Sequence, residues 1–168
     1  MASVHIANYV DMAYMFNITS GVGRGRANQR LDVMLIQYLL SQAMNEQASG
    51  STTTWNHILP PDLVGGLNQD GICGDKTQRA IDFYQAFRNG HSTRSDANRM
   101  DIQFKVAQDG AIDPWRFPVA MNFGFTTSQL SRTDTLVTLC YDAAKSRDFV
   151  SMNFSQMHPD LRRLLCAH

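Results

Sequence analysis

Hydrophobic residues recur at helical spacing in several stretches of this chain. In the first stretch, which begins at Asn28, apolar side chains would cover more than half the circumference of a helix, so this helix is predicted to be largely buried. A second helix is predicted from Asp75 to about Arg88, because an acidic residue suits the positive end of the helix dipole and a basic residue the negative end. Its apolar residues share one stripe, and Asn89-Gly90 follows as a stop signal.

Two more helices are predicted in the C-terminal third. The run from Ser131 to Asp148 places apolar residues on one face of a helix. Pro159 is typical of a helix start, and the three leucines behind it indicate a short amphipathic last helix. Short extended stretches are predicted at 102–106 and 119–125. The pattern therefore predicts a mainly α-helical protein.

Polar, glycine-rich and proline-rich segments separate these helices. Residues 1–20 show no clean alternation of apolar and polar positions, and the glycines of the SGVGRGR stretch then indicate a loop or flexible joint. Residues 46–67 are predicted to form a long loop, and residues 89–101 a second polar insertion. The two insertions flank the second helix, and loops of this length often carry function.

The composition fits one compact domain. The chain has 168 residues, of which 43% are hydrophobic and 18% charged, and 15 basic residues balance 15 acidic ones. A net charge of zero provides no long-range attraction for phosphate backbones or anionic lipids, so neither nucleic acid nor a membrane is an expected partner. The first residues lack the basic start of a Sec signal. We therefore expect a chain that is cytoplasmic as synthesised, with export by a non-Sec route left open.

The chain lacks the residue patterns that metal sites and common catalytic sites need. Three scattered cysteines form no Cys-x-x-Cys pair and are expected to be reduced thiols. The five histidines are too far apart to place two zinc ligands on one helix face, and the loop around Asp70 lacks the strong carboxylates of a calcium loop. The single glutamate, Glu46, selects no carboxylate pair for glycoside cleavage. We therefore expect no metal, no cofactor and no catalytic residue.

One short feature recurs along the chain. Asp70-Gly71 lies at the edge of an apolar segment, and so does Asp109-Gly110. Asp-Gly favours a tight turn, because glycine accepts positive φ and aspartate hydrogen-bonds the backbone ahead of it. After the first pair, Gly74 permits a sharp start to the second helix, and Thr77 can interact with free N–H groups of its first turn. These six residues are predicted to be structural.

The sequence DGICGDKTQRAIDFYQ at 70–85 resembles the turn-helix motif of the peptidoglycan-binding-like domain, a three-helix module attached to many bacterial cell-wall hydrolases and found in metalloprotease pro-segments. The opening helix LDVMLIQYLL and the second turn VAQDGAID extend a looser resemblance over about 28–116. The resemblance implies a three-helix bundle core with long loop insertions, an N-terminal extension at 1–27 and an additional C-terminal helical segment at 117–168. Where the family has a glycine after the second turn, this chain has Asp113.

A sugar or peptide ligand needs an aromatic face flanked by amide and guanidinium donors. Five residues could supply that mixture: Trp55, Tyr84, Gln85, Arg88 and Trp115. Each residue also has a possible structural role. The tyrosine could belong to the core, and the glutamine could form a hydrogen bond near a helix end. The arginine could cap the helix, and either tryptophan could anchor a loop. Trp55 is the leading candidate for a ligand contact. It lies in a polar loop, so a role in core packing accounts for it less well than for the other four residues.

The resemblance implies a non-enzymatic binding module for peptidoglycan or a cell-wall fragment, of bacterial or phage origin, that would suit phage lysis or a secretion system. The alternative is a protein-protein interaction adaptor on the same scaffold, with the inserted loops and terminal extensions as its contact surface. An enzyme built around Cys73 or the C-terminal region, such as a cell-wall hydrolase, is a third hypothesis. The sequence leaves the oligomeric state open.

Overall fold

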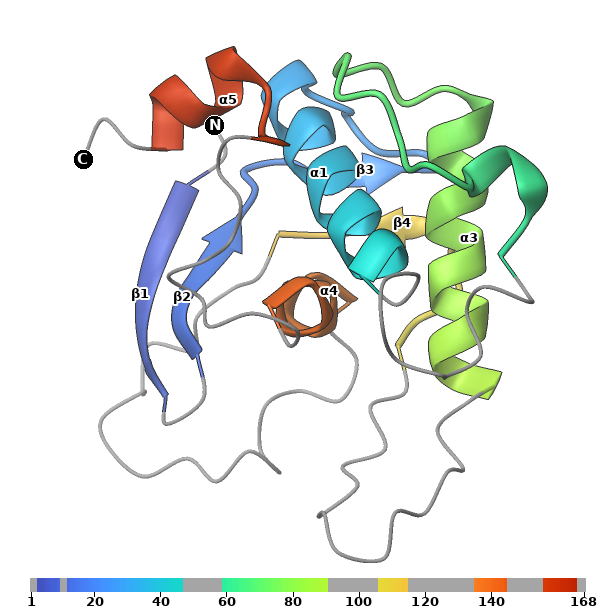
Figure 1. Ribbon diagram of the computed structural model, residues 1–168, viewed down its shortest axis with the longest axis horizontal. Coiled ribbons are helices and arrows are strands. Elements are labelled where there is room, and N and C mark those ends of the chain that lie inside the picture. The colour runs from blue at the N-terminus through green and yellow to red at the C-terminus, as the bar shows by residue number, and fades with distance from the viewer. Residues whose placement is uncertain are drawn as a thin grey trace, which may run out of the picture.

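The computed structural model describes residues 3–9, 12–46, 59–90, 106–114, 135–144 and 156–165. Within these ranges the protein is mainly helical, as the sequence predicts (Figure 1). Four α-helices are present there: α1 (Arg30–Glu46), α3 (Asp75–Gly90), α4 (Thr135–Ala144) and α5 (Pro159–Leu165). The other described elements are a 3-10 turn, η1 (Pro61–Leu63), and the strands β1 (Ser3–Tyr9), β2 (Met12–Asn17), β3 (Val22–Gly23) and β4 (Ala111–Ile112).

Helix α1 lies at the centre of the core. Every residue from 32 to 44 is buried, so the helix is covered on all sides rather than along one stripe. Helices α3, α4 and α5 each pack against it, and Figure 1 shows α4 nearly end-on beside α1 and α3. The prediction of a largely buried first helix is confirmed.

The other predicted helices are also present. The second prediction corresponds to α3, which continues through Asn89 and Gly90 rather than stopping before them. The predictions for the C-terminal third correspond to α4 and α5. Their apolar residues are buried with those of α1 in one core, which includes Leu35, Leu39 and Met44 of α1, Ala80, Ile81 and Tyr84 of α3, Leu136, Leu139 and Cys140 of α4, and Leu161 of α5.

The N-terminal segment contains strands that the sequence pattern does not reveal. β1 and β2 form an antiparallel hairpin in which Val4 lies opposite Phe16, and the register shifts between Ile6 and Tyr9. A one-residue shift reverses which positions face the core, and this breaks the period-2 signal on which strand prediction depends. Phe16 is fully buried, and β2 packs against α4. The lack of clean alternation therefore did not mean a lack of strands.

The glycine-rich stretch that follows is a loop, as predicted, but it is hydrogen-bonded to the rest of the fold rather than a free joint. Its first part is β3, which pairs antiparallel with β4. The side chain of Asn28 accepts the Gly23 N–H at 2.7 Å and donates to the Gly23 carbonyl at 3.1 Å, which closes the loop. Asn28 has a φ of 51°, a left-handed conformation that asparagine tolerates better than most residues.

Several predictions fall outside the described residues. These are the extended stretches at 102–105 and 119–125, residues 47–58 of the first insertion and residues 91–101 of the second. Asn89 accepts the Val106 N–H at 3.0 Å and donates to the Val106 carbonyl at 2.8 Å, so its side chain joins the end of α3 to a residue that follows the second insertion. Among the described helices, none is long and apolar enough to cross a membrane.

Candidate functional site at two glutamine-clamped turns

The first Asp-Gly turn is held by a glutamine of α1. Gln37 is buried, and its Nε2 donates to Asp70 Oδ1 at 2.8 Å and to the Ile72 carbonyl at 3.1 Å. Its Oε1 accepts the Gly71 N–H at 3.0 Å. Asp70 Oδ1 also accepts the Ile72 N–H at 2.9 Å, so the carboxylate closes the turn on itself. These bonds lower the pKa of Asp70 below its usual value, with the Ile72 N–H as the main cause.

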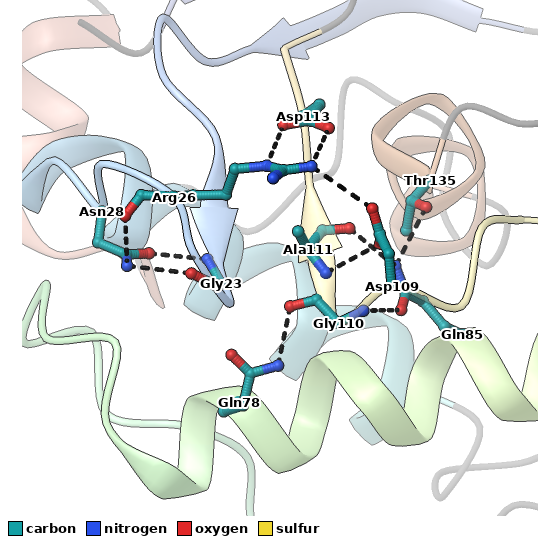
Figure 2. Close-up of polar contacts among 10 residues, drawn as sticks. All are labelled: Gly23, Arg26, Asn28, Gln78, Gln85, Asp109, Gly110, Ala111, Asp113 and Thr135. Carbon is teal, nitrogen blue, oxygen red and sulfur yellow. Dashed lines mark hydrogen bonds and ion pairs between the residues drawn. The ribbon is translucent and has the colours of Figure 1, made fainter.

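The second Asp-Gly turn is held in the same way by a glutamine of α3 (Figure 2). Gln85 is buried, and its Nε2 donates to Asp109 Oδ1 at 3.3 Å and to the Ala111 carbonyl at 2.8 Å. Its Oε1 accepts the Gly110 N–H at 3.0 Å, and Asp109 Oδ1 accepts the Ala111 N–H at 3.0 Å. Each of these bonds has a counterpart in the first turn. We call the two arrangements the glutamine-clamped turns.

The equivalence extends to the helix residues that face each glycine. Both glycines have positive φ, 76° at Gly71 and 70° at Gly110. A Cβ built on either glycine would lie within 3.0 Å of a side chain from the adjacent helix, so the close approach requires glycine. The helix positions involved match in order and spacing: Arg30, Met34 and Gln37 in α1, and Gln78, Asp82 and Gln85 in α3. The chain therefore contains two copies of one helix-turn unit.

A threonine from the following helix contacts each clamping glutamine. Thr77 Oγ1 accepts from Gln37 Nε2 at 3.1 Å and donates to the Ile72 carbonyl at 3.3 Å, rather than bonding to free N–H groups of α3. Thr135, the first residue of α4, accepts from Gln85 Nε2 at 3.5 Å. Helix α4 is thus related to the second turn as α3 is to the first, although the connection through residues 115–134 is much longer.

The segment Gly21–Asn28, which we call the N-terminal loop, covers the second glutamine-clamped turn. After the β3–β4 pairing, the N–H of Arg24 donates to the Gly110 carbonyl at 2.9 Å. The guanidinium group of Arg24 forms an ion pair with Asp82 at 3.1 Å. This ion pair is largely exposed and contributes little by itself, so the backbone pairing is the main attachment.

Arg26 attaches the N-terminal loop to two carboxylates (Figure 2). Its guanidinium group donates to the two oxygens of Asp113 at 2.7 and 2.8 Å and to Asp109 Oδ2 at 3.5 Å. This bidentate hydrogen bonding to Asp113 raises the pKa of Arg26. Asp113 therefore has a structural partner within the chain.

A C-terminal segment contacts the first glutamine-clamped turn from another side. Gln69 Nε2 donates to the Gln156 carbonyl at 2.8 Å, and Gln69 Oε1 accepts the His158 N–H at 2.7 Å. Arg30, at the start of α1, forms an ion pair with Asp160 of α5 at 3.3 Å. The N-terminal loop thus attaches to the second turn and the segment 156–160 to the first.

Three residues expected to contact a ligand lie on α3, and all three have internal partners. Tyr84 is fully buried and donates its hydroxyl proton to Asp142 Oδ2 at 2.7 Å, and burial raises the pKa of Tyr84 well above its usual value. Arg88 forms a mostly buried ion pair with the other Asp142 oxygen. Gln85 is the second clamp. These side chains serve the fold, and burial leaves Tyr84 and Gln85 with no surface for a ligand.

The remaining predicted site residues are the two tryptophans and the residues of the two turns. Trp55 and Trp115, the other two expected contacts, lie outside the described residues. The aspartates and glycines of the two turns have the structural role predicted for them. Gly74 lies just before α3, but a Cβ built there would meet no atom within 4 Å, so no steric contact requires a glycine at this position.

Gln37 is the structural residue that the sequence analysis missed. A signal was present, because Gln37 lies inside the most apolar run of the first helix, LDVMLIQYLL. A polar side chain in a helix buried on all sides needs an internal hydrogen-bond partner. Each Asp-Gly pair is preceded by a helix that contains a glutamine, Gln37 before the first pair and Gln85 before the second. This shared order could have revealed the role of Gln37.

The described residues offer little for metal or thiol chemistry. Within them, no group of three His, Cys, Asp or Glu side chains could hold a metal ion. Cys73 is a free, partly buried thiol, and burial raises its pKa, which makes it less reactive. Cys140 is buried, and its thiol donates to the Phe16 carbonyl at 3.6 Å.

Comparison with known proteins gave no match: no family model, no curated protein and no solved structure matches this chain significantly. The resemblance to the peptidoglycan-binding-like domain therefore depends on the sequence motif alone.

Proposed function

We propose that this protein is a non-enzymatic module that binds peptidoglycan or a cell-wall fragment and is built on the peptidoglycan-binding-like arrangement. The pair of glutamine-clamped turns carries the proposal. The motif residues that resemble the family are the ones that form the clamps: Asp70, Gly71 and Thr77 around the first turn, and Gln85 at the second. A physical role for each of these residues supports the view that the motif marks a fold rather than a chance match.

In this proposal, α1, α3 and α4 are the three helices of the module. Helix α3 follows the first turn and α4 the second, and each contributes a threonine to the clamp before it. The resemblance implies three helices within about 28–116, but the described residues of that range contain two α-helices, α1 and α3. Residues 115–134 would then be an insertion between the second turn and the third helix, which extends the module to Ala144.

The proposed ligand contacts are Trp55 and Trp115. An indole ring offers an apolar face that packs against the apolar side of a sugar ring. Trp115 directly follows Pro114, close in sequence to the second turn, and Trp55 belongs to the insertion between α1 and η1. Tyr84, Gln85 and Arg88 are no longer included, because their polar groups already have internal partners.

Sedimentation with purified insoluble peptidoglycan tests this proposal. We expect the full chain to pellet with the wall material and Trp55→Ala to weaken retention about fivefold, since an aromatic contact contributes ~1 kcal/mol. Trp55→Phe should keep most of the binding. Arg79→Gln, which removes an exposed ion pair with Asp62, is the control and should bind like the wild type. A wild-type chain that stays in the supernatant would overturn the proposal.

The non-enzymatic part of the proposal has its own test. The chain is incubated with the same wall material, and the supernatant is analysed by mass spectrometry. We expect no soluble muropeptides. Their release by the purified chain would instead support a cell-wall hydrolase.

A protein-protein interaction adaptor is the second candidate function, and one observation favours it. Val64 and Ile72 are large apolar side chains that are 64% and 67% exposed, and a protein partner could cover them. A complex with a defined protein partner that is weakened by Ile72→Lys, together with no retention on peptidoglycan, would favour the adaptor over the wall-binding module.

A further inference from the structure

The segment that leads into Trp115 is held in place up to the last residue that the structure describes there. Strand β4 pairs with β3, and both of its residues are buried. Asp113 comes next, and Arg26 binds its two carboxylate oxygens at 2.7 and 2.8 Å (Figure 2). Pro114 follows, and its ring restricts the backbone torsion φ. Trp115, a proposed ligand contact, is therefore joined by one peptide bond to an anchored segment.

The contact between Arg26 and Asp113 is more restrictive than a single ion pair. Two hydrogen bonds to one carboxylate fix its orientation as well as its distance from the guanidinium group. The backbone of Gly21 packs against the pair, because a Cβ built there would lie 2.6 Å from Asp113 Oδ1 and 2.7 Å from Arg26 Cδ. Arg26 also donates to Asp109 Oδ2 at 3.5 Å. One side chain of the N-terminal loop thus binds carboxylates on both sides of β4.

Arg24, in the same loop, provides a comparison. Its guanidinium group pairs with Asp82 through one hydrogen bond at 3.1 Å, and its side chain is 64% exposed, against 35% for Arg26. Asp82 lies within α3, whose buried apolar residues hold the helix in the core independently of this pair. The two arginines carry the same charge, but it is the Arg26 guanidinium that binds the segment before Trp115.

We propose that Arg26 is a positioning residue for cell-wall binding: by holding Asp113, it sets the position from which Trp115 contacts a sugar ring of the ligand. This inference rests on the proposed function. A contact residue whose attachment is already held loses less conformational freedom when the ligand binds, so it contributes more to affinity. The inference gives a role in binding to the N-terminal extension at 1–27, which lies outside the family resemblance.

The expected effect of losing Arg26 has an upper limit. Trp115→Ala should weaken retention on peptidoglycan about fivefold, as expected for Trp55→Ala. A residue that acts only through Trp115 cannot weaken binding more than removal of the indole itself does. We therefore expect Arg26→Gln to weaken retention about threefold. In a chain that already carries Trp115→Ala, the same substitution should have no further effect.

Sedimentation of the full chain with insoluble peptidoglycan measures these effects in matched variants. Asp113→Asn should weaken retention as much as Arg26→Gln, and the double variant should bind no more weakly than either single variant. The two substitutions change the net charge in opposite directions, so equal losses cannot arise from attraction between the chain and a charged wall. Arg24→Gln removes the same charge from the same loop and is the control, which should bind like the wild type.

Fluorescence anisotropy tests the positioning role without a ligand. The chain has two tryptophans, so Trp115 is the single tryptophan in a Trp55→Phe chain. In that chain, Arg26→Gln should lower the anisotropy of Trp115, because the segment before it moves more freely on the nanosecond timescale. Arg24→Gln should leave the anisotropy unchanged.

The outcomes distinguish this inference from the proposed function. A wild-type chain that does not sediment with peptidoglycan overturns the proposed function and, with it, the role of Arg26 in binding. The role of Arg26 alone is overturned if the wild type sediments and Arg26→Gln either binds like the wild type or leaves the anisotropy of Trp115 unchanged. It is also overturned if Arg26→Gln binds more weakly than Trp115→Ala, because the arginine would then contact the ligand directly.

Discussion

The substitution Gln37→Met removes the first clamp while keeping an unbranched side chain of similar length. Gln37 is buried, so solvent cannot replace the lost bonds. Its amide donates to Asp70, Ile72 and Thr77 and accepts the Gly71 N–H. The substitution should therefore destabilise the fold by more than the loss of one ordinary hydrogen bond.

The magnitude follows from which groups lose their last partner. The N–H of Gly71 is buried and loses its acceptor, which costs about 1–3 kcal/mol. Asp70 and the Ile72 carbonyl each lose one hydrogen-bond donor but keep another. Each loss should therefore reduce the free energy of unfolding by about 0.5 kcal/mol. The total is about 3 kcal/mol, which lowers the melting temperature of a domain of this size by roughly 10 °C.

Urea unfolding followed by circular dichroism measures this loss. Gln42→Met is the matched control, because Gln42 is buried on the same helix and makes one side-chain hydrogen bond, to Gln156 at 3.0 Å. We expect a loss of about 1 kcal/mol for the control. If Gln37→Met costs no more than Gln42→Met, the reasoning about the clamp is refuted.

Three other predictions concern the contacts around the turns. Gly23→Ala should cost about 2–4 kcal/mol, because its Cβ would collide with the Gly110 carbonyl and its φ is 114°; an unfolding midpoint equal to that of the wild type would contradict the β3–β4 pairing. Asp142→Ala should cost about 3 kcal/mol in the same assay, because it leaves the mostly buried Arg88 guanidinium without its carboxylate; replacing both partners by apolar residues should recover part of the loss. The lowered pKa of Asp70 contributes stability that is fully present above the unfolded pKa of about 3.9 and is lost as the pH falls through the folded value. The stability difference between wild type and Asp70→Asn should therefore shrink as the pH falls below about 5, and a constant difference would show that the ionised carboxylate is not what closes the turn.

The helices could be predicted because their signal is local. The apolar stripe behind Asp75 and the leucines behind Pro159 each occur within one helix, and burial of those residues stabilises the same helix. The Asp-Gly turns were predictable for the same reason, since glycine and aspartate determine the turn within a few residues.

The contacts that assemble the site could not be predicted in this way, because they join residues far apart in the chain. β3 is a two-residue strand in a glycine-rich loop, and its Val22 lies opposite Ile112 of β4, 90 residues further along the sequence. Tyr84 and Arg88 had the composition of ligand contacts, and only the position of Asp142 on α4 shows that their polar groups are engaged inside the fold. A sequence pattern indicates which side chains can bind, but not which of them the tertiary structure already uses.

Hydrogen exchange of the Gly71 and Gly110 amides tests the two equivalent clamps most directly. Each amide donates to a buried glutamine side chain, at 3.0 Å in both turns. In the wild-type chain both amides should exchange far more slowly than those of an exposed loop, and Gln37→Met should release Gly71 more than Gly110, with Gln85→Met giving the reverse. Exchange of either amide at the rate of an unprotected peptide in the wild-type chain would contradict the duplicated clamp on which the proposed fold and function depend.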